Sequence, residues 1–133
     1  MRRLLFDYSH TYDPAAPVIE VEVVGYQPAS RRITQIALVD SGADATMMPR
    51  HILRQVGAEF LETRRMRGVI GVSQRVRVYI VAIHIGEQVL HGVRVAELAA
   101  GDETILGRNV LNQLRLTLDG LGSQTTVEFY NEL

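Results

Sequence analysis

The sequence contains no cysteine. Disulfide bonds, thiol nucleophiles and thiolate metal sites are therefore excluded, while the redox compartment is left open. Long apolar runs are also missing, because the apolar start of the chain, Leu4 to Phe6, stops at Asp7 and no other run approaches the length of a membrane span. We therefore expect a cytoplasmic protein that has no membrane partner.

Lysine is absent as well, so all 14 basic residues are arginine, and they stand against 15 acidic residues. The formal net charge of −1 gives no reason to expect nucleic acid or an anionic membrane as a partner. The exclusive use of arginine carries no functional conclusion by itself.

Metal-binding histidine patterns are missing too. The histidines are scattered and never show the His-Glu-x-x-His spacing of a zinc hydrolase: His10, His51, His84 and His91. The pair around the turn, His84 and His91, is typical of exposed strand residues. A metal or serine hydrolase therefore has little support, and we expect no metal and no cofactor.

The remaining pattern is that of one β-rich domain. A chain of 133 residues with 47% hydrophobic content can bury a core, and we expect a single domain over 1–133 with its core at about 18–130. Val18 to Val24 alternates apolar and acidic residues, which predicts a half-buried strand. Further strands are predicted at 32–39, 60–66, 75–85, 88–96, 115–118 and 125–130. Many short strands separated by turns indicate an all-β barrel or sandwich.

Two short helices interrupt the strands. Pro49 can open a helical turn over 50–56 that Gly57 closes. A second helix is predicted over 108–114, where apolar residues repeat at helical spacing. Residues 1–17 are mixed in character, and Pro14 and Pro17 predict irregular structure there.

The stretch 36–46 stands out because an apolar strand ends on a carboxylate, Asp40, followed by Ser41, Gly42 and Ala43. An unpaired charge at the end of a buried strand needs partners. Serine, glycine and alanine are typical of turns, so for this stretch alone the simplest interpretation is a strand that ends in an ordinary β-turn. A second stretch of the sequence favours a functional role for Asp40 instead.

A second stretch, Thr104 to Leu111, reads Thr-Ile-Leu-Gly-Arg-Asn-Val-Leu. Together the two stretches resemble the retroviral-type aspartic proteases, or retropepsins, in which an Asp-Thr/Ser-Gly-Ala segment follows an apolar strand. In that family an apolar-apolar-Gly segment with Arg-Asp/Asn comes later and leads into a helix. Either motif is weak alone, and the pair in this order is more specific. The resemblance covers about 18–118 and implies a closed all-β barrel of the acid-protease type with one short C-terminal helix and one lobe per chain.

The resemblance implies an aspartic endopeptidase. Two facing carboxylates would share one proton and activate a water molecule. This sequence has one Asp-Ser-Gly, since the nearest candidate, Asp119-Gly120, lacks the hydroxyl and is typical of a hairpin turn. The second carboxylate would come from a second copy of Asp40, so the resemblance implies a homodimer acting on an extended peptide or unstructured protein.

The remaining site residues carry over from the family. Ser41 would hold the two active-site loops together across the two-fold axis, and Gly42 would let the backbone approach the carboxylate pair. Ala43 and Asp44 match positions that bind the substrate backbone, although Asp44 can equally form a plain salt bridge with Arg108. Supporting hydrogen bonds are expected from Thr46 and Asn109.

The glycine-punctuated segment Gly68, Val69, Ile70 and Gly71 resembles the family's flap, a hairpin that closes over bound peptide. Without the motif pair, an ordinary exposed hairpin is an equal interpretation. An extended peptide could add as a strand between the flap and the floor of the site.

One departure from the viral enzymes is the final hairpin after 118, which could replace the sheet that chain ends form in the viral dimer. A second interpretation keeps the fold without the chemistry: a non-catalytic dimerisation or peptide-binding module. The intact Asp40-Ser41-Gly42 counts against it.

Overall fold

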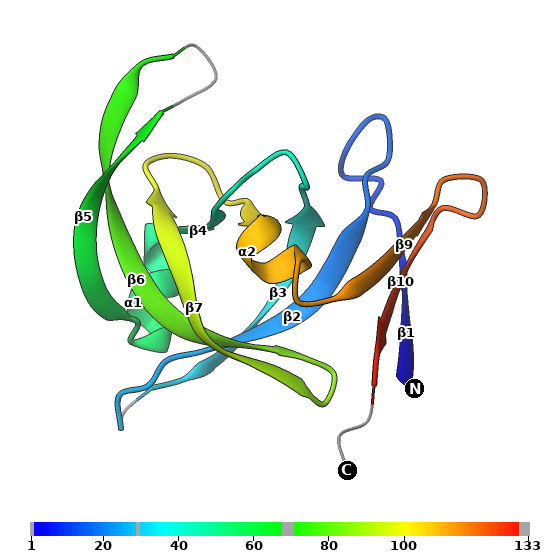
Figure 1. The fold of residues 1–133 in the computed structure, drawn as a ribbon, viewed down its shortest axis with the longest axis horizontal. Helices are drawn as coiled ribbons and strands as arrows, with labels where there is room; N and C mark the ends of the chain where they lie inside the picture. Colours follow the sequence, from blue (N-terminus) through cyan, green and yellow to red (C-terminus); the bar gives the residue numbers. More distant parts are fainter. Residues whose placement is uncertain (1, 29, 68–70, 131–133) are drawn as a thin grey trace.

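The computed structural model describes residues 2–28, 30–67 and 71–130 (Figure 1). Within these residues it shows strands and two short helices, in the order β1 (Arg2–Asp7), β2 (Val18–Val24), β3 (Arg32–Val39), β4 (Thr46–Pro49), α1 (Arg50–Val56), β5 (Glu59–Arg67), β6 (Ser73–Ile85), β7 (Gln88–Leu98), β8 (Thr104–Leu106), α2 (Arg108–Leu111), β9 (Arg115–Asp119) and β10 (Gln124–Phe129). None of the helices in the described part of the chain is long and apolar enough to cross a membrane.

Six strands form a closed barrel. The strand order β2-β3-β8-β4-β7-β6 is closed into a ring because β2 also pairs with β6, through Val23 and Ile83 among others. The expected all-β closed barrel with one lobe per chain is therefore confirmed. Among the described residues, strand β5 pairs with β6 alone, so the β5–β6 hairpin extends beyond the barrel. Figure 1 shows this hairpin standing away from the body of the molecule.

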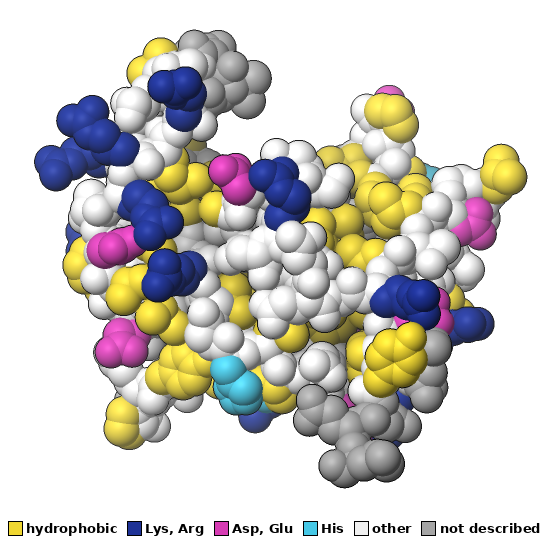
Figure 2. Space-filling view, in the orientation of Figure 1, with side chains coloured by type: hydrophobic (Ala, Val, Ile, Leu, Met, Phe, Trp, Pro, Cys, Tyr) yellow, Lys and Arg dark blue, Asp and Glu magenta, His cyan; other side chains and the backbone are white. Residues whose placement is uncertain are grey.

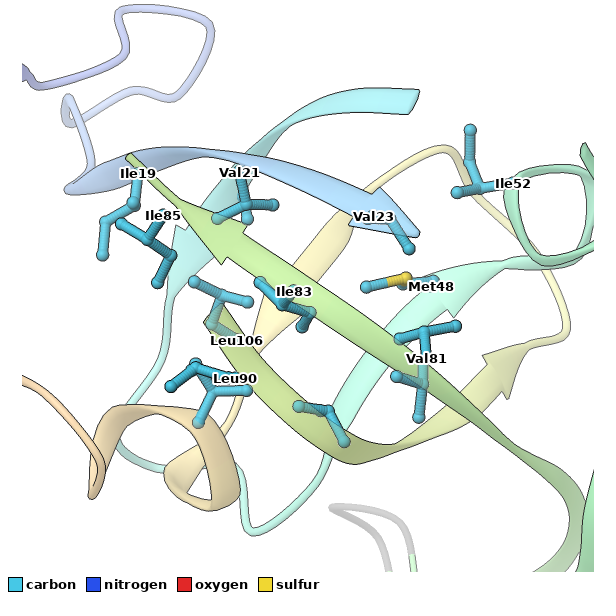
Figure 3. Close-up of a cluster of buried hydrophobic side chains, with 14 of the residues drawn as sticks. Ile19, Val21, Val23, Met48, Ile52, Val81, Ile83, Ile85, Leu90 and Leu106 are labelled. Atoms are coloured by element: carbon cyan, nitrogen blue, oxygen red, sulfur yellow. The ribbon is translucent and has the colours of Figure 1, made fainter. Parts of the chain in front are cut away.

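The alternation of side chains along the strands builds the core. Ile19, Val21 and Val23 of β2 are buried, whereas Glu20 between them is exposed. Because successive side chains of a strand point to opposite faces, the acidic residues reach water while the apolar residues meet inside the barrel. Figure 3 shows them packing against residues of β4, β6, β7 and β8, including Met48, Ile83 and Leu106.

The two strands that carry the motifs lie side by side. Strand β3 pairs in parallel with β8, with Val39 opposite Leu106. Parallel neighbours end at the same edge of a sheet, so Asp40 and Gly107 emerge together from adjacent strands. Strand β4 returns antiparallel to β8 through the pair Met47 and Ile105. This topology brings two segments that are distant in the sequence to one edge of the barrel.

Both predicted helices are present. Helix α1 begins after Pro49 and ends at Gly57, whose φ of 66° places it in the left-handed region that glycine adopts readily. Helix α2 is shorter than expected and ends at Leu111, after which the amide groups of Gln113 and Leu114 bond three residues back. The buried faces of α1 and α2 pack onto the barrel core.

A three-stranded sheet with the order β1-β10-β9 packs beside the barrel. The predicted C-terminal hairpin is confirmed as β9 and β10, and Asp119 lies at its turn, where its Oδ1 accepts the Gly122 amide at 2.9 Å. The expectation of irregular structure over 1–17 is wrong for residues 2–7. These residues lack alternation, and they form a strand because β10 pairs with them along their whole length.

Candidate active site

Asp40 leaves the end of β3 with its backbone held on both sides. The Val39 amide donates to the Pro17 carbonyl at 3.0 Å, and the Asp40 amide donates to the Leu106 carbonyl at 3.1 Å. The half-buried Asp40 carboxylate accepts the Gly42 amide through Oδ1 at 2.9 Å. Its carbonyl also accepts the Ala43 amide at 3.2 Å, so residues 40–45, here called the Asp40 loop, begin with a tight turn.

Gly42 lies where a side chain would crowd the Asp40 carboxylate. A Cβ at this position would lie 3.1 Å from Asp40 Oδ1, closer than side-chain carbons normally approach. The glycine thus allows its own amide to reach the carboxylate, which agrees with the role that the resemblance assigns to it.

Arg108 of the second motif is hydrogen-bonded to the Asp40 loop. The Arg108 amide donates to the Ala43 carbonyl at 2.8 Å, and the Arg108 side chain donates through NH1 to the Ser41 carbonyl at 2.9 Å. The alternative of an Asp44–Arg108 salt bridge is therefore wrong for the described residues, in which no such pair forms. The Asp44 and Arg108 side chains are both exposed, and an exposed ion pair contributes little stability. The Arg108 guanidinium instead donates to the Ser41 carbonyl.

Thr46 and Asn109 form the buried connection between the motifs. Asn109 Oδ1 accepts the Thr46 hydroxyl at 2.7 Å and the Thr46 amide at 3.1 Å. The Thr46 hydroxyl in turn accepts the Gly107 amide at 3.1 Å, and Asn109 Nδ2 donates to the Arg94 carbonyl at 2.9 Å. The expectation that both residues support the loops by hydrogen bonds is confirmed.

Gly107 allows the two motifs to touch. A Cβ at this position would lie 2.4 Å from both the carbonyl carbon and the carbonyl oxygen of Ala45. Any side chain would push the Asp40 loop away from the helix that supports it. This is the physical reason for a glycine after the apolar Ile105-Leu106.

A cleft of about 670 Å³ opens beside the Asp40 loop. Asp40, Gly42, Ala43 and Asp44 line one side of it, and residues of the β5–β6 hairpin line the facing side. Figure 2 shows this hollow between the projecting hairpin and the body of the molecule, with hydrophobic side chains inside it. A volume of this size is in the range of ligand-binding pockets.

The β5–β6 hairpin contributes part of the lining of this cleft. Its strands run to Arg67 and Ser73, and Gly71 has a φ of 78° in the connection between them. The other flap residues named from the sequence, Gly68, Val69 and Ile70, lie outside the described residues. The hairpin itself is in place above the cleft that holds Asp40.

Sequence reasoning missed several charged residues around the cleft. Arg67, Arg75 and Arg77 of the hairpin line it, and so does an ion pair in which Arg50 Nε lies 3.1 Å from Glu97 Oε1. The hydrogen bond from Arg50 to the nearly buried Glu97 carboxylate raises the pKa of Arg50. In the sequence, the alternation Arg75-Val76-Arg77 of the predicted strand indicates a charged face. It does not indicate that this face borders a cleft.

The histidines stand apart from this site. His10, His51 and His91 are exposed, whereas His84 is half-buried because β2 pairs beside it through Glu22. The expectation of an exposed His84 is therefore corrected. Within the described ranges, no three acidic or histidine side chains gather in an arrangement that could hold a metal ion.

A single-lobe closed barrel, in which an Asp-Ser-Gly loop is bonded to a Gly-Arg-Asn helix start, defines the retropepsin-like class of aspartic protease folds. The fold is similar to that of a retropepsin-like aspartic protease from Rickettsia conorii, with a TM-score of 0.68 and 11% identity over 95% of this chain and 90% of that chain. It is also similar to the EIAV protease complexed with the inhibitor HBY-793, with a TM-score of 0.57 and 20% identity over 74% of this chain and 86% of that chain. At these identities the similarity shows a shared fold alone.

The family described as "gag-polyprotein putative aspartyl protease" matches residues 31–113, more than half of the chain. The chain belongs to this family of retropepsin-like aspartic proteases. The matched range includes both motifs and the hairpin between them. No match was found among curated proteins.

Proposed function

We propose that this protein is an aspartic endopeptidase that is active as a homodimer. The observation that carries the proposal is a half-buried carboxylate, Asp40, that lines a cleft of about 670 Å³ on a loop to which the second motif is hydrogen-bonded. One chain brings one such Asp-Ser-Gly loop, so a two-fold axis beside Asp40 supplies the second carboxylate.

The chemistry follows from two facing carboxylates. They share one proton, because two like charges this close cannot both ionise. The ionised carboxylate takes a proton from a water molecule, which attacks the carbonyl carbon of the peptide bond, while the protonated carboxyl group donates to the carbonyl oxygen. The C–N bond then breaks as a proton passes to the leaving nitrogen, and no covalent enzyme adduct forms.

Each neighbouring residue has a separate role in this proposal. Ser41 bonds across the axis to the partner's loop, and Gly42 keeps its amide on Asp40. Ala43 and Asp44 line the cleft, where they bind the backbone of an extended substrate. The flap named from the sequence, Gly68, Val69, Ile70 and Gly71, follows β5 in the sequence and covers that substrate in this proposal, so the peptide adds as a strand.

The partner would approach the side of the molecule that carries the Asp40 loop. Figure 1 shows this loop, the β9–β10 turn and the connection between β1 and β2 on the same side. In the viral enzymes the chain ends form the dimer sheet, but here β1 and β10 pair within one chain. The three-stranded sheet therefore takes the place of that arrangement beside the axis.

The test compares Asp40→Asn with a matched aspartate at a turn. Asp119 also accepts a glycine amide through Oδ1, so Asp119→Asn makes the same chemical change away from the cleft. Because Asp119 lies at the β9–β10 turn on the side proposed for the partner, sizing checks first that this variant dimerises like the wild type. An unstructured protein is incubated with each variant from acidic to neutral pH. We expect wild type and Asp119→Asn to cleave it with a bell-shaped pH profile, because the pair works only while it holds one proton.

Asp40→Asn should be folded and inactive, since an amide cannot exchange the proton that the reaction needs. Cleavage by purified Asp40→Asn at the wild-type rate would exclude the catalytic assignment. A rate that keeps rising above neutral pH would indicate another base.

A further inference from the structure

The β5–β6 hairpin concentrates positive charge. Between Glu59 and Arg77 the sequence has five arginines and two glutamates, which is a formal charge of +3, whereas the whole chain has −1. The rest of the chain therefore carries −4. The arginines are Arg64, Arg65, Arg67, Arg75 and Arg77, and all of them are exposed.

The register of the hairpin puts four of these arginines on one face. Arg65 lies directly opposite Arg75, while Arg77 is opposite Thr63 and Arg67 is opposite Ser73. Because residues that are directly opposite share a face, and residues two apart along a strand share it too, we call Arg65, Arg67, Arg75 and Arg77 the arginine face. Like charges directly opposite each other destabilise a strand pair, so this arrangement costs the free protein stability.

Acidic neighbours do little to neutralise the arginine face. Glu62 lies on the opposite face of the hairpin and pairs there with Arg64 at 2.8 Å. The guanidinium of Arg77 lies 5.1 Å from the centre of the Phe60 ring, an aromatic contact that leaves its charge in place. Among the described residues, Arg65, Arg67 and Arg75 form no ion pair. Their planar donor groups are thus available to carboxylates from outside the chain.

The arginine face borders the peptide cleft. Arg67, Arg75 and Arg77 line the cleft that contains Asp40. An adjoining hollow of about 420 Å³ is lined by Arg65 and Arg67 and also by Arg64 of the opposite face. Figure 2 shows basic side chains gathered over the projecting hairpin. A chain that leaves the cleft along the hairpin would meet these guanidinium groups next.

We propose that the arginine face binds an acidic segment of the polypeptide substrate, next to the segment that occupies the cleft. This inference rests on the proposed function for the identity of the cleft ligand. Glutamate and aspartate pair bidentately with guanidinium groups, and they relieve the repulsion between Arg65 and Arg75. A nucleic acid fits less well, because its charge extends beyond the hairpin toward a body with a formal charge of −4.

The experiment uses two peptides with the same central sequence, cut from the unstructured protein of the cleavage assay. One carries four flanking glutamates and the other carries four flanking glutamines. Their affinities for full-length Asp40→Asn and their cleavage by the active enzyme are measured at low and high salt. We expect about a three- to tenfold preference for the acidic peptide in both Kd and kcat/KM, which shrinks as salt screens the charges.

The variant Arg65→Gln/Arg75→Gln should reduce this preference to about onefold and should fold at least as stably as wild type, because it removes a like-charge pair. The matched control is Arg31→Gln/Arg54→Gln, which makes the same charge change at exposed arginines that form no ion pair among the described residues. The control should keep the preference.

The two proposals fail in distinguishable ways. Equal binding of both peptides by Asp40→Asn would overturn the arginine-face proposal, even if the wild type cleaves both. Preferential binding without cleavage would support the arginine face and exclude the peptidase. A single-stranded oligonucleotide of equal charge that binds more tightly than the acidic peptide would also overturn the proposal.

Discussion

Thr46 shows how one side chain links the two halves of the site. It is fully buried, and its hydroxyl donates to Asn109 Oδ1 while accepting the Gly107 amide. The same Asn109 oxygen accepts the Thr46 amide. Buried polar groups need such partners, because an unsatisfied donor or acceptor carries the full cost of its desolvation. Three residues from two distant segments thus satisfy one another.

Replacing Thr46 with valine tests this connection. Valine keeps the shape of threonine but leaves the Gly107 amide and one Asn109 lone pair without partners, so we expect a loss of about 1–3 kcal/mol in the free energy of unfolding. Thr46→Ser is the control, because it keeps the hydroxyl and should retain most of the stability. Urea denaturation of the three proteins measures the difference. A valine variant as stable as the wild type would contradict the role of these hydrogen bonds, whereas a loss in the serine variant would measure the packing of the methyl group that serine lacks.

The three-stranded sheet is the element whose formation depends most on distant residues. Its strands come from the start and the end of the chain, and Val127 of β10 lies between Leu4 of β1 and Leu116 of β9. Val127 is fully buried and belongs to the same core cluster as the barrel residues. The sheet is therefore packed onto the barrel rather than attached as a separate hairpin.

A truncation of Val127 measures that packing. Val127→Ala removes two buried methyl groups, and we expect it to lower the free energy of unfolding by about 2 kcal/mol. Leu118→Ala is the control from the adjacent strand, since Leu118 is 53% exposed and should change stability by less than about 0.5 kcal/mol. A single unfolding transition that shifts with Val127→Ala would show that sheet and barrel unfold together. An unchanged main transition would contradict the shared core.

At the scale of the whole molecule, the proposed reaction requires two chains. One chain offers one Asp40 loop, which lines the cleft. The barrel itself needs no second chain, because it closes within one chain through the pairing of β2 with β6. In the proposed mechanism, folding and completion of the active site are therefore separate events, and mass action governs the second.

Activity per mole of chain should therefore rise with protein concentration and level off once dimers dominate. Adding excess Asp40→Asn to wild type should suppress activity by more than dilution, because each mixed dimer has one ionisable Asp40. Sizing under assay conditions should show dimers at the concentrations where activity is maximal. Full specific activity from a species that sizes as a monomer would mean that one chain supplies both acids, and would exclude the dimeric mechanism.

Local patterns in the sequence determined most of the barrel. The alternation of Val18 to Val24 and the Pro49 and Gly57 boundaries of α1 depend on short-range geometry that a window of residues displays, whereas the paired motifs at Asp40 and Gly107 were recognised by their resemblance to a family. Their outcomes agree with the structure because the backbone periods of strands and helices set which side chains share a face.

Other features were decided only by the tertiary structure. Residues 2–7 became a strand because β10 pairs with them, Arg108 bonded the Ser41 carbonyl instead of Asp44, and four arginines came to share one face beside the cleft. Each of these depends on which distant segments meet and in what register. Such pairings are set by packing and hydrogen bonding over the whole chain, and a short stretch of sequence carries no record of its distant partner.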